Sequence, residues 1–185
     1  MGLFLETVII QHCEESAARI AFKKLSKMEN PYVISDLECR YKQYGKGTLV
    51  LLNEDSNGYE RLAGALSEEL HSPVMLLYIY DEDFWGYYFY ENGKELDCYN
   101  PMPDYFDESI SEEDVDRFSG RADVIAKYFD VNEEKIQSYL ITWTDEIEEQ
   151  DDNNKMKAYD DDVFGVGECW QVTDFMRKIG YPYAW

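Results

Sequence analysis

Apolar residues recur at two different spacings along the first half of the chain. Residues 3–10 form a short apolar run that is typical of a strand, and residues 14–28 carry apolar side chains on one helical face. Residues 32–41 and 48–53 are two further β-type runs, joined across a glycine-rich turn at residues 45–47. This part of the chain therefore predicts a strand, a helix and a hairpin.

A second helix and a further strand continue this pattern. Apolar residues recur at helical spacing over residues 59–70, directly after turn-forming residues at 56–58. Pro73 ends that helix, and Val74 begins the next strand. The order strand-helix-strand-strand-helix-strand is the split βαβ arrangement of a ferredoxin-like domain, in which both helices cover one face of the sheet. We therefore predict an α+β fold with this core, extended by an aromatic hairpin.

Residues 74–99 predict three consecutive strands that are rich in aromatic side chains. Asn92-Gly93 is a strong two-residue turn signal, and it fixes which residues of the flanking strands face each other. With residues 81–83 as the loop of the preceding hairpin, alternate residues divide into two sets. One face then carries mainly apolar residues, namely Met75, Leu77, Ile79, Trp85, Tyr87, Phe89, Leu96 and Cys98. The opposite face carries tyrosines and carboxylates, namely Tyr78, Tyr80, Tyr88, Tyr90, Glu95, Asp97 and Tyr99.

The tyrosine and carboxylate face is the predicted recognition surface. Tyrosine is enriched at interfaces because it combines a large contact area with a polar tip. The competing interpretation is that later helices cover this face and bond each hydroxyl to a carboxylate or a backbone group. Trp85 and Tyr88 would serve equally well as core residues. The candidate binding residues, on these strands and in the proline-braced loop after them, are Trp85, Tyr88, Asp97, Tyr99, Asp104 and Tyr105.

The second half of the chain is predicted to be mainly helical. Apolar stripes at helical spacing run over residues 122–129 and 136–143, and a last helix carries apolar residues over 172–179. Between them, residues 145–162 are acidic and polar and predict a mobile loop. A chain of 185 residues that is 45% hydrophobic can bury one full core. We therefore predict a single domain over residues 1–185, with a sheet-forming half at 1–106 and a mainly helical half at 107–185.

Charge narrows the class of partner. The formal net charge of -22 repels phosphate backbones and anionic lipids, so we expect neither nucleic-acid binding nor membrane-surface binding. A basic protein or a cation would be attracted instead, although an acidic surface also keeps a protein soluble. The amino-terminal residues fit neither a signal peptide nor a membrane span, and we expect a cytoplasmic protein.

Sequence patterns for metal and cofactor binding are weak. The four cysteines are Cys13, Cys39, Cys98 and Cys169, and they form no CxxC pair. This spacing is typical of reduced thiols in the cytoplasm, and it disfavours a zinc site. Asp151, Asn153 and Asp162 match three positions of an EF-hand loop, but Lys155 replaces a ligand and Met156 replaces the turn glycine. We predict no cofactor. A solvated charge run and irregular calcium binding are the two remaining interpretations of Asp151, Asp152 and residues 160–162.

The aromatic strands also carry a resemblance to known proteins. The segment PVMLLYIYDEDFWGYYFYENGKELDCYNPMPDYF follows LSEEL and precedes an acidic stretch and FSGRADVIAKYF. From Leu62 to Trp143 the chain resembles a family of bacterial proteins whose function is unassigned. The most specific parts are the turns at residues 83–85 and 93–97 and the loop at 100–106. The resemblance implies a shared fold and no particular activity.

These observations favour a non-enzymatic binding protein, an immunity-like or regulatory partner of a basic protein. The comparison with immunity proteins, which neutralise toxins, is one of general character, since they are also small, acidic, bacterial α+β proteins. A first alternative is a hydrolase that uses Asp97, Asp104 or Asp107 as acid and base beside the proline loop. A second alternative is a structural homo-oligomer, because the sequence leaves the oligomeric state open.

Overall fold

The computed structural model describes residues 2–26, 39–52, 58–107, 109–148 and 155–185. Some of the sequence predictions lie outside these residues. They are the end of the first helix at residues 27 and 28, the strand residues 32–38 and 53, the turn residues Ser56 and Asn57, and the loop residues Asp151, Asp152 and Asn153.

The chain forms two compact units that alternate along the sequence. We call Phe4–Tyr78 with Tyr87–Leu96 the amino-terminal unit, and Met1–Leu3, Ile79–Gly86 and Asp97–Trp185 the carboxy-terminal unit. Three strands cross from one unit into the other, because the boundaries after Tyr78, Gly86 and Leu96 fall inside them. Neither unit is therefore a continuous piece of the chain.

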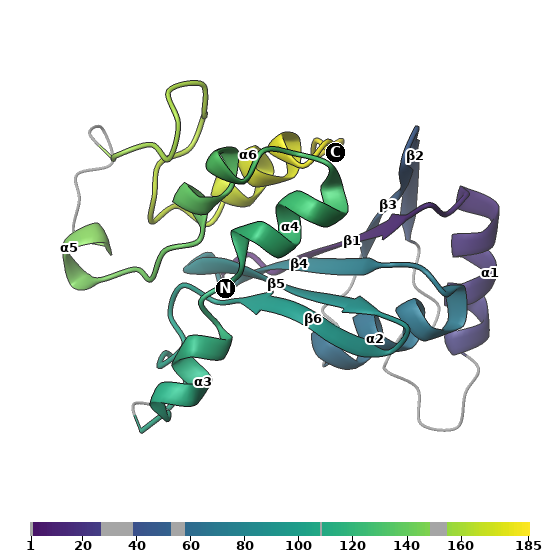
Figure 1. Ribbon diagram of the computed structural model, residues 1–185, viewed down its shortest axis with the longest axis horizontal. Helices are drawn as coiled ribbons and strands as arrows, with labels where there is room; N and C mark the ends of the chain where they lie inside the picture. Colours follow the sequence, from purple (N-terminus) through teal and green to yellow (C-terminus); the bar gives the residue numbers. More distant parts are fainter. Residues whose placement is uncertain (1, 27–38, 53–57, 108, 149–154) are drawn as a thin grey trace. The chain divides into compact units, whose positions relative to one another are not determined.

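In the described residues, six strands form one sheet in the order β2-β3-β1-β4-β5-β6 (Figure 1). The strands are β1 (Leu5–Gln11), β2 (Arg40–Tyr44), β3 (Gly47–Leu52), β4 (Val74–Tyr80), β5 (Phe84–Glu91) and β6 (Lys94–Tyr99). Strand β3 is buried along its whole length, whereas the edge strand β2 is exposed or half-buried at every position. The most apolar strands therefore occupy the inside of the sheet.

The first four strands form the predicted ferredoxin-like core. Helix α1 (Glu15–Leu25) joins β1 to β2, and helix α2 (Tyr59–Leu70) joins β3 to β4. Strand β3 pairs antiparallel with both β1 and β2, so it lies between the two strands that α1 connects. Helices α1 and α2 pack against each other (Figure 1). This topology confirms the predicted α+β fold with a split βαβ core and an added hairpin.

Two turns of the amino-terminal unit follow directly from the sequence. Tyr44 pairs with Gly47, so the β2–β3 turn consists of Gly45 and Lys46, and β2 continues beyond its predicted end. Strand β5 ends just before Asn92-Gly93 and β6 begins just after it. Both turn residues have positive φ angles, 50° and 74°, as a two-residue hairpin turn requires. The predicted position of this turn is confirmed.

The carboxy-terminal unit packs short helices around a small aromatic core. Its helices are α3 (Glu112–Arg117), α4 (Ala122–Phe129), the 3-10 turns η1 (Glu133–Lys135) and η2 (Gln137–Tyr139), α5 (Asp145–Glu148) and α6 (Gln171–Lys178). The predicted helices at 122–129 and 172–179 are confirmed. The apolar stripe at 136–143 instead forms η2 and an extended segment, in which the Trp143 N–H donates to the Pro101 carbonyl (2.9 Å).

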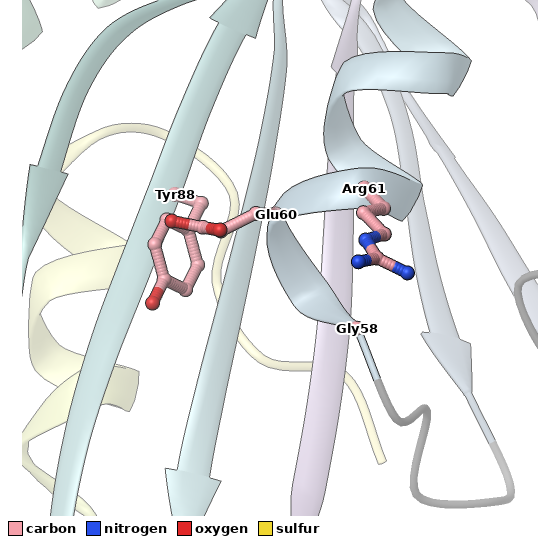
Figure 2. A pocket seen from close by; sticks show the side chains of 4 residues that line it. All are labelled: Gly58, Glu60, Arg61 and Tyr88. Carbon is pink, nitrogen blue, oxygen red and sulfur yellow. The ribbon is translucent and has the colours of Figure 1, made fainter.

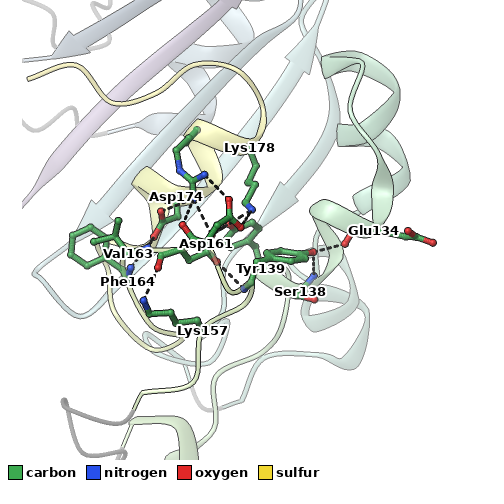
Figure 3. Close-up of polar contacts among 12 residues, drawn as sticks. Glu134, Ser138, Tyr139, Lys157, Asp161, Val163, Phe164, Asp174 and Lys178 are labelled. Atoms are coloured by element: carbon green, nitrogen blue, oxygen red, sulfur yellow. Dashed lines mark hydrogen bonds and ion pairs between the residues drawn. The ribbon is translucent and has the colours of Figure 1, made fainter.

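The segment after the acidic loop is anchored to α6 by buried carboxylates (Figure 3). Asp162 accepts hydrogen bonds from the Tyr139 hydroxyl (2.6 Å) and the Tyr159 N–H (3.0 Å), and it pairs with Arg177 (3.3 Å). Asp174 also pairs with Arg177, at 3.1 Å, and accepts two backbone N–H groups from residues 163 and 164. The carboxyl end of the predicted mobile loop is therefore fixed.

Within the described ranges, no helix combines the length and the apolar character that a membrane crossing requires.

Candidate functional site

Trp85 and Tyr99 lie in the core of the carboxy-terminal unit. Their side chains are 0% and 1% exposed, and their ring centroids are 5.0 Å apart. The Trp85 indole donates to the side chain of Gln171 (3.2 Å), and the Tyr99 hydroxyl donates to the Ile141 carbonyl (2.8 Å). The hairpin register had placed the two rings on opposite faces of the sheet, but the structure brings them together. Neither ring is presented to solvent, so a partner cannot contact them without unfolding.

Asp97 is also buried, at 6% exposure, and its carboxylate already has a backbone partner. It accepts the Arg121 N–H (2.9 Å) at the residue that precedes α4. A carboxylate at this position satisfies an otherwise unpaired N–H and complements the positive end of the helix dipole. Asp97 therefore has a structural role as the cap of α4.

Tyr88 lies in the amino-terminal unit, where α2 partly covers the tyrosine face. It is half-buried and stacks on Tyr78, with ring centroids 5.8 Å apart. It lines a small pocket of about 200 Å³ together with three α2 residues, Gly58, Glu60 and Arg61 (Figure 2). An adjoining hollow of about 320 Å³ includes Tyr90. This part of the predicted surface is a shallow groove beside α2 and not an open sheet face.

Asp104 and Tyr105 lie on the surface, next to a cluster of aromatic rings in the carboxy-terminal unit. Phe106 packs edge-to-face on Tyr80 (5.0 Å) and on Tyr105 (4.9 Å), and Phe84 contacts Tyr105 from below (5.2 Å). Phe84 is fully buried, whereas Tyr105 is 40% exposed and Phe106 is 65% exposed. We call these four rings the aromatic platform. It combines a buried base with an open upper surface.

The proline loop holds the two outer rings of the platform in place. Asn100 caps the loop by accepting the Met102 N–H (2.9 Å) on its side chain. Two successive turns follow, in which the Tyr105 N–H donates to Met102 (3.1 Å) and the Asp107 N–H donates to Asp104 (3.1 Å). These turns fix the backbone on both sides of Phe106, so the ring stays exposed against Tyr80 and is not withdrawn into the core.

Carboxylates flank the platform residues along the chain. All of these carboxylates are exposed. We call them the acidic rim, which consists of Asp81, Glu82, Asp83, Asp104 and Asp107. The Tyr105 hydroxyl donates to Asp83 (2.6 Å), which raises the pKa of Tyr105 to about 12. Ser109 donates its hydroxyl and its N–H to Asp107, which lowers the pKa of Asp107. Among the described residues, no lysine or arginine forms an ion pair with any member of the rim.

The turn that carries the first part of the rim is conformationally strained. Asp81 and Glu82 have φ angles of 48° and 71°, and the Asp83 N–H closes the turn on the Tyr80 carbonyl (2.9 Å). Asn-Gly is the usual sequence for such a turn, because side chains with a Cβ avoid the left-handed region. The Glu82 N–H donates to the Leu3 carbonyl (2.9 Å), so the amino-terminal segment helps to hold the turn.

The three carboxylates of the predicted hydrolase have different environments. Asp97 is buried and bonded to a backbone N–H, while Asp104 and Asp107 are exposed. A carboxyl group that works as a general acid needs a raised pKa, and the shift at Asp107 is in the opposite direction. In the described part of the chain, no three His, Cys, Asp or Glu residues are placed to hold a metal ion.

Negative charge is concentrated in the carboxy-terminal unit. Its sequence contains 26 Asp and Glu against 8 Lys and Arg, a formal charge of -18, whereas the amino-terminal unit contains 13 against 9, a formal charge of -4. The platform and its rim therefore belong to the unit that supplies most of the net charge of -22. A positively charged partner would be drawn to this unit first.

No family model matches the chain, and comparisons with curated proteins and with solved structures found no match. The resemblance to a bacterial family over Leu62 to Trp143 therefore stays a prediction. The fold class rests on the strand order and the two crossover helices.

Proposed function

We propose that this protein is a non-enzymatic binding protein that recognises a basic protein partner through the aromatic platform and the acidic rim. The observation that carries the proposal is Phe106, a large apolar side chain that is 65% exposed on a base of packed aromatic rings. A rigid, exposed aromatic cluster with a polar rim is the usual composition of an interface hot spot. The function would be immunity-like or regulatory.

Electrostatics supports a basic partner over a neutral one. The rim carboxylates have no lysine or arginine partner in the described residues, so a cationic surface could pair with them without displacing existing ion pairs. The formal charge of -18 on the same unit would speed the encounter at low ionic strength. We place this binding in the cytoplasm, because all four cysteines are free thiols.

The proposal is tested by affinity capture from a lysate of the source cells at low and then moderate salt. Wild type is compared with Phe106→Ala and with Ile20→Ala, a matched control on α1 whose side chain is 68% exposed. We expect wild type and Ile20→Ala to retain a basic protein that Phe106→Ala loses, and moderate salt to weaken the retention.

Two outcomes would contradict the proposal. If Phe106→Ala retains the same partner as wild type, recognition uses another surface. If no basic protein is retained by wild type at low salt, the protein does not have this function. Circular dichroism of each variant shows whether a loss of capture comes from unfolding.

A further inference from the structure

We infer that the partner presents an arginine side chain to the platform, with its guanidinium stacked on Phe106 and its N–H groups bonded to carboxylates of the acidic rim. This inference rests on the proposed function and specifies the chemistry that the surface recognises. Net charge alone would attract arginine and lysine equally, whereas the inferred contact favours arginine over lysine.

The Phe106 ring is open to solvent. Phe106 contacts Tyr80, Tyr105 and Phe84 at interplanar angles of 89°, 76° and 68°, so its three ring neighbours are steeply inclined to it. With 65% of the side chain exposed, most of the ring surface is available to a ligand. A cation is attracted to such a ring surface, and guanidinium groups occur there more often than ammonium groups.

The described residues already contain four cation–ring contacts, two from arginine and two from lysine. The guanidinium of Arg19 lies 3.9 Å from the ring centroid of Tyr41 in the amino-terminal unit. Among the described residues, no lysine or arginine lies in this way over Tyr105 or Phe106. Tyr105 and Phe106 therefore offer ring surface without a cation of the kind that covers Tyr41.

Carboxylate oxygens beside Tyr105 can accept the N–H groups of a stacked guanidinium. Asp83 uses one carboxylate oxygen for the Tyr105 hydroxyl, and its other oxygen remains available. Asp104, next to Tyr105 in the loop, has no ion pair with a described residue. A stacked guanidinium directs its N–H groups outward in the plane of the group, where they can reach more than one carboxylate. An ammonium group can also lie over a ring and donate to a carboxylate, as Lys178 does at Tyr159 and Asp161, but it is compact and strongly hydrated and lacks the planar face of a guanidinium.

The Tyr105 hydroxyl has a positioning role in this arrangement. Its hydrogen bond to Asp83 joins the proline loop to the β4–β5 turn. The proline loop carries the Phe106 ring, and the turn carries three carboxylates of the acidic rim. Tyr105→Phe removes this bond and keeps both the ring and the rim charge. We expect it to reduce the preference for arginine less than the loss of the Phe106 ring does.

The experiment uses the full chain and two blocked peptides of equal length and charge, one with three arginines spaced by glycine and one with three lysines. Binding is followed by ¹⁵N NMR titration at low ionic strength. We expect the arginine peptide to bind about three- to tenfold more tightly and to shift the signals of residues 80–83 and 104–107. In Phe106→Leu, which keeps an apolar side chain without a ring, the two affinities should become equal. Ile20→Leu should leave the preference unchanged.

The outcomes separate this inference from the proposed function. Equal affinity of wild type for both peptides, with shifts at residues 80–83 and 104–107, would overturn the arginine inference and leave an acidic recognition surface. A preference for arginine that persists in Phe106→Leu would also overturn it, because the ring would not be the cause. If neither peptide shifts these residues, both the inference and the proposed surface are wrong.

Discussion

Asp81 and Glu82 occupy turn positions that ordinarily belong to asparagine and glycine. A non-glycine residue in the left-handed region costs about 1 kcal/mol or more, and this turn contains two of them in succession. Such strain is found at sites where a particular side chain is needed more than stability. Here the two side chains supply two carboxylates of the acidic rim, so the turn exchanges stability for charge next to the platform.

We therefore expect Asp81→Asn with Glu82→Gly to raise the free energy of unfolding by about 1 to 2 kcal/mol, because both new residues tolerate positive φ. Urea denaturation measures the change. The matched control is Glu113→Gly in α3, also an exposed glutamate, where the helix should lose about 1 kcal/mol. A turn variant that is no more stable than wild type would show that the native turn is unstrained.

At the scale of single residues, the sequence distinguished buried from exposed tyrosines poorly. Tyr99 and Tyr88 were assigned to the same face by strand alternation, yet one is fully buried and the other is half-buried. Alternation gives the face of a strand, but it does not tell which later segment covers that face. The sequence patterns do not identify Phe106 as a site residue. A signal was present, because Phe106 follows Pro101 and Pro103 in a loop, where an aromatic side chain does not pack as part of a strand.

Helix α6 and the segment before it are held together by one arginine between two buried carboxylates. The side chains of Asp162 and Asp174 are 0% and 3% exposed, and Arg177 contacts both. Removing Arg177 would leave the buried Asp174 without its ion-pair partner and Asp162 with only the longer contact to Lys178 (3.8 Å), which costs more than the ion pair itself contributes. The element therefore depends on Arg177 more than its partial exposure suggests.

We expect Arg177→Met to lower the free energy of unfolding by about 3 kcal/mol. The control is Arg121→Met, because Arg121 pairs through its side chain with Asp123 where both are about 60% exposed, and the change should be below about 0.5 kcal/mol. Thermal and urea unfolding of the three proteins provide the measurement. Equal stability of both variants would mean that water already screens the cluster around Arg177.

Elements with strong local signals were predictable from the sequence, and elements that depend on tertiary contacts were not. The Asn92-Gly93 turn and helix α4 follow from local chemistry, and both were predicted at their observed positions. The apolar stripe around Tyr139 was predicted as a helix, but it forms a 3-10 turn and then an extended segment. There the Tyr139 hydroxyl bonds to Asp162, a contact between residues distant in sequence that helical spacing cannot reveal.

At the scale of the whole molecule, stability should depend on pH at both ends of the scale. Bonds from Lys178 and Arg177 lower the pKa of Asp161, and bonds from Ser109 lower the pKa of Asp107. These groups stabilise the fold above their unfolded pKa near 4, and the contribution is lost as the pH falls toward their folded pKa. Burial raises the pKa of Tyr99 and Tyr139, and it raises that of Tyr181 to about 12.

The raised tyrosine pKa values stabilise the fold fully below the unfolded value near 10, and this contribution is lost as the pH rises toward the folded values. Burial also raises the pKa of the Cys13, Cys39 and Cys169 thiols, whose contribution begins to be lost above their unfolded pKa near 9. We therefore expect a plateau of stability between about pH 4 and about pH 9, with losses on both sides. Unfolding midpoints in urea across this range test it. Protonation at low pH also relieves repulsion among the 39 acidic residues, so the acid limb should be shallower than the alkaline limb. A steeper acid limb would contradict this account.

The aromatic platform is assembled from two stretches of chain that the amino-terminal unit separates. Tyr80 and Phe84 precede residues 87–96, and Tyr105 and Phe106 follow them. The platform is therefore a conformational epitope and not a linear one. A synthetic peptide of residues 100–107 should neither compete for the proposed basic partner nor elicit antibodies that bind the platform of the folded chain. Selection of blocking reagents needs the intact, folded chain.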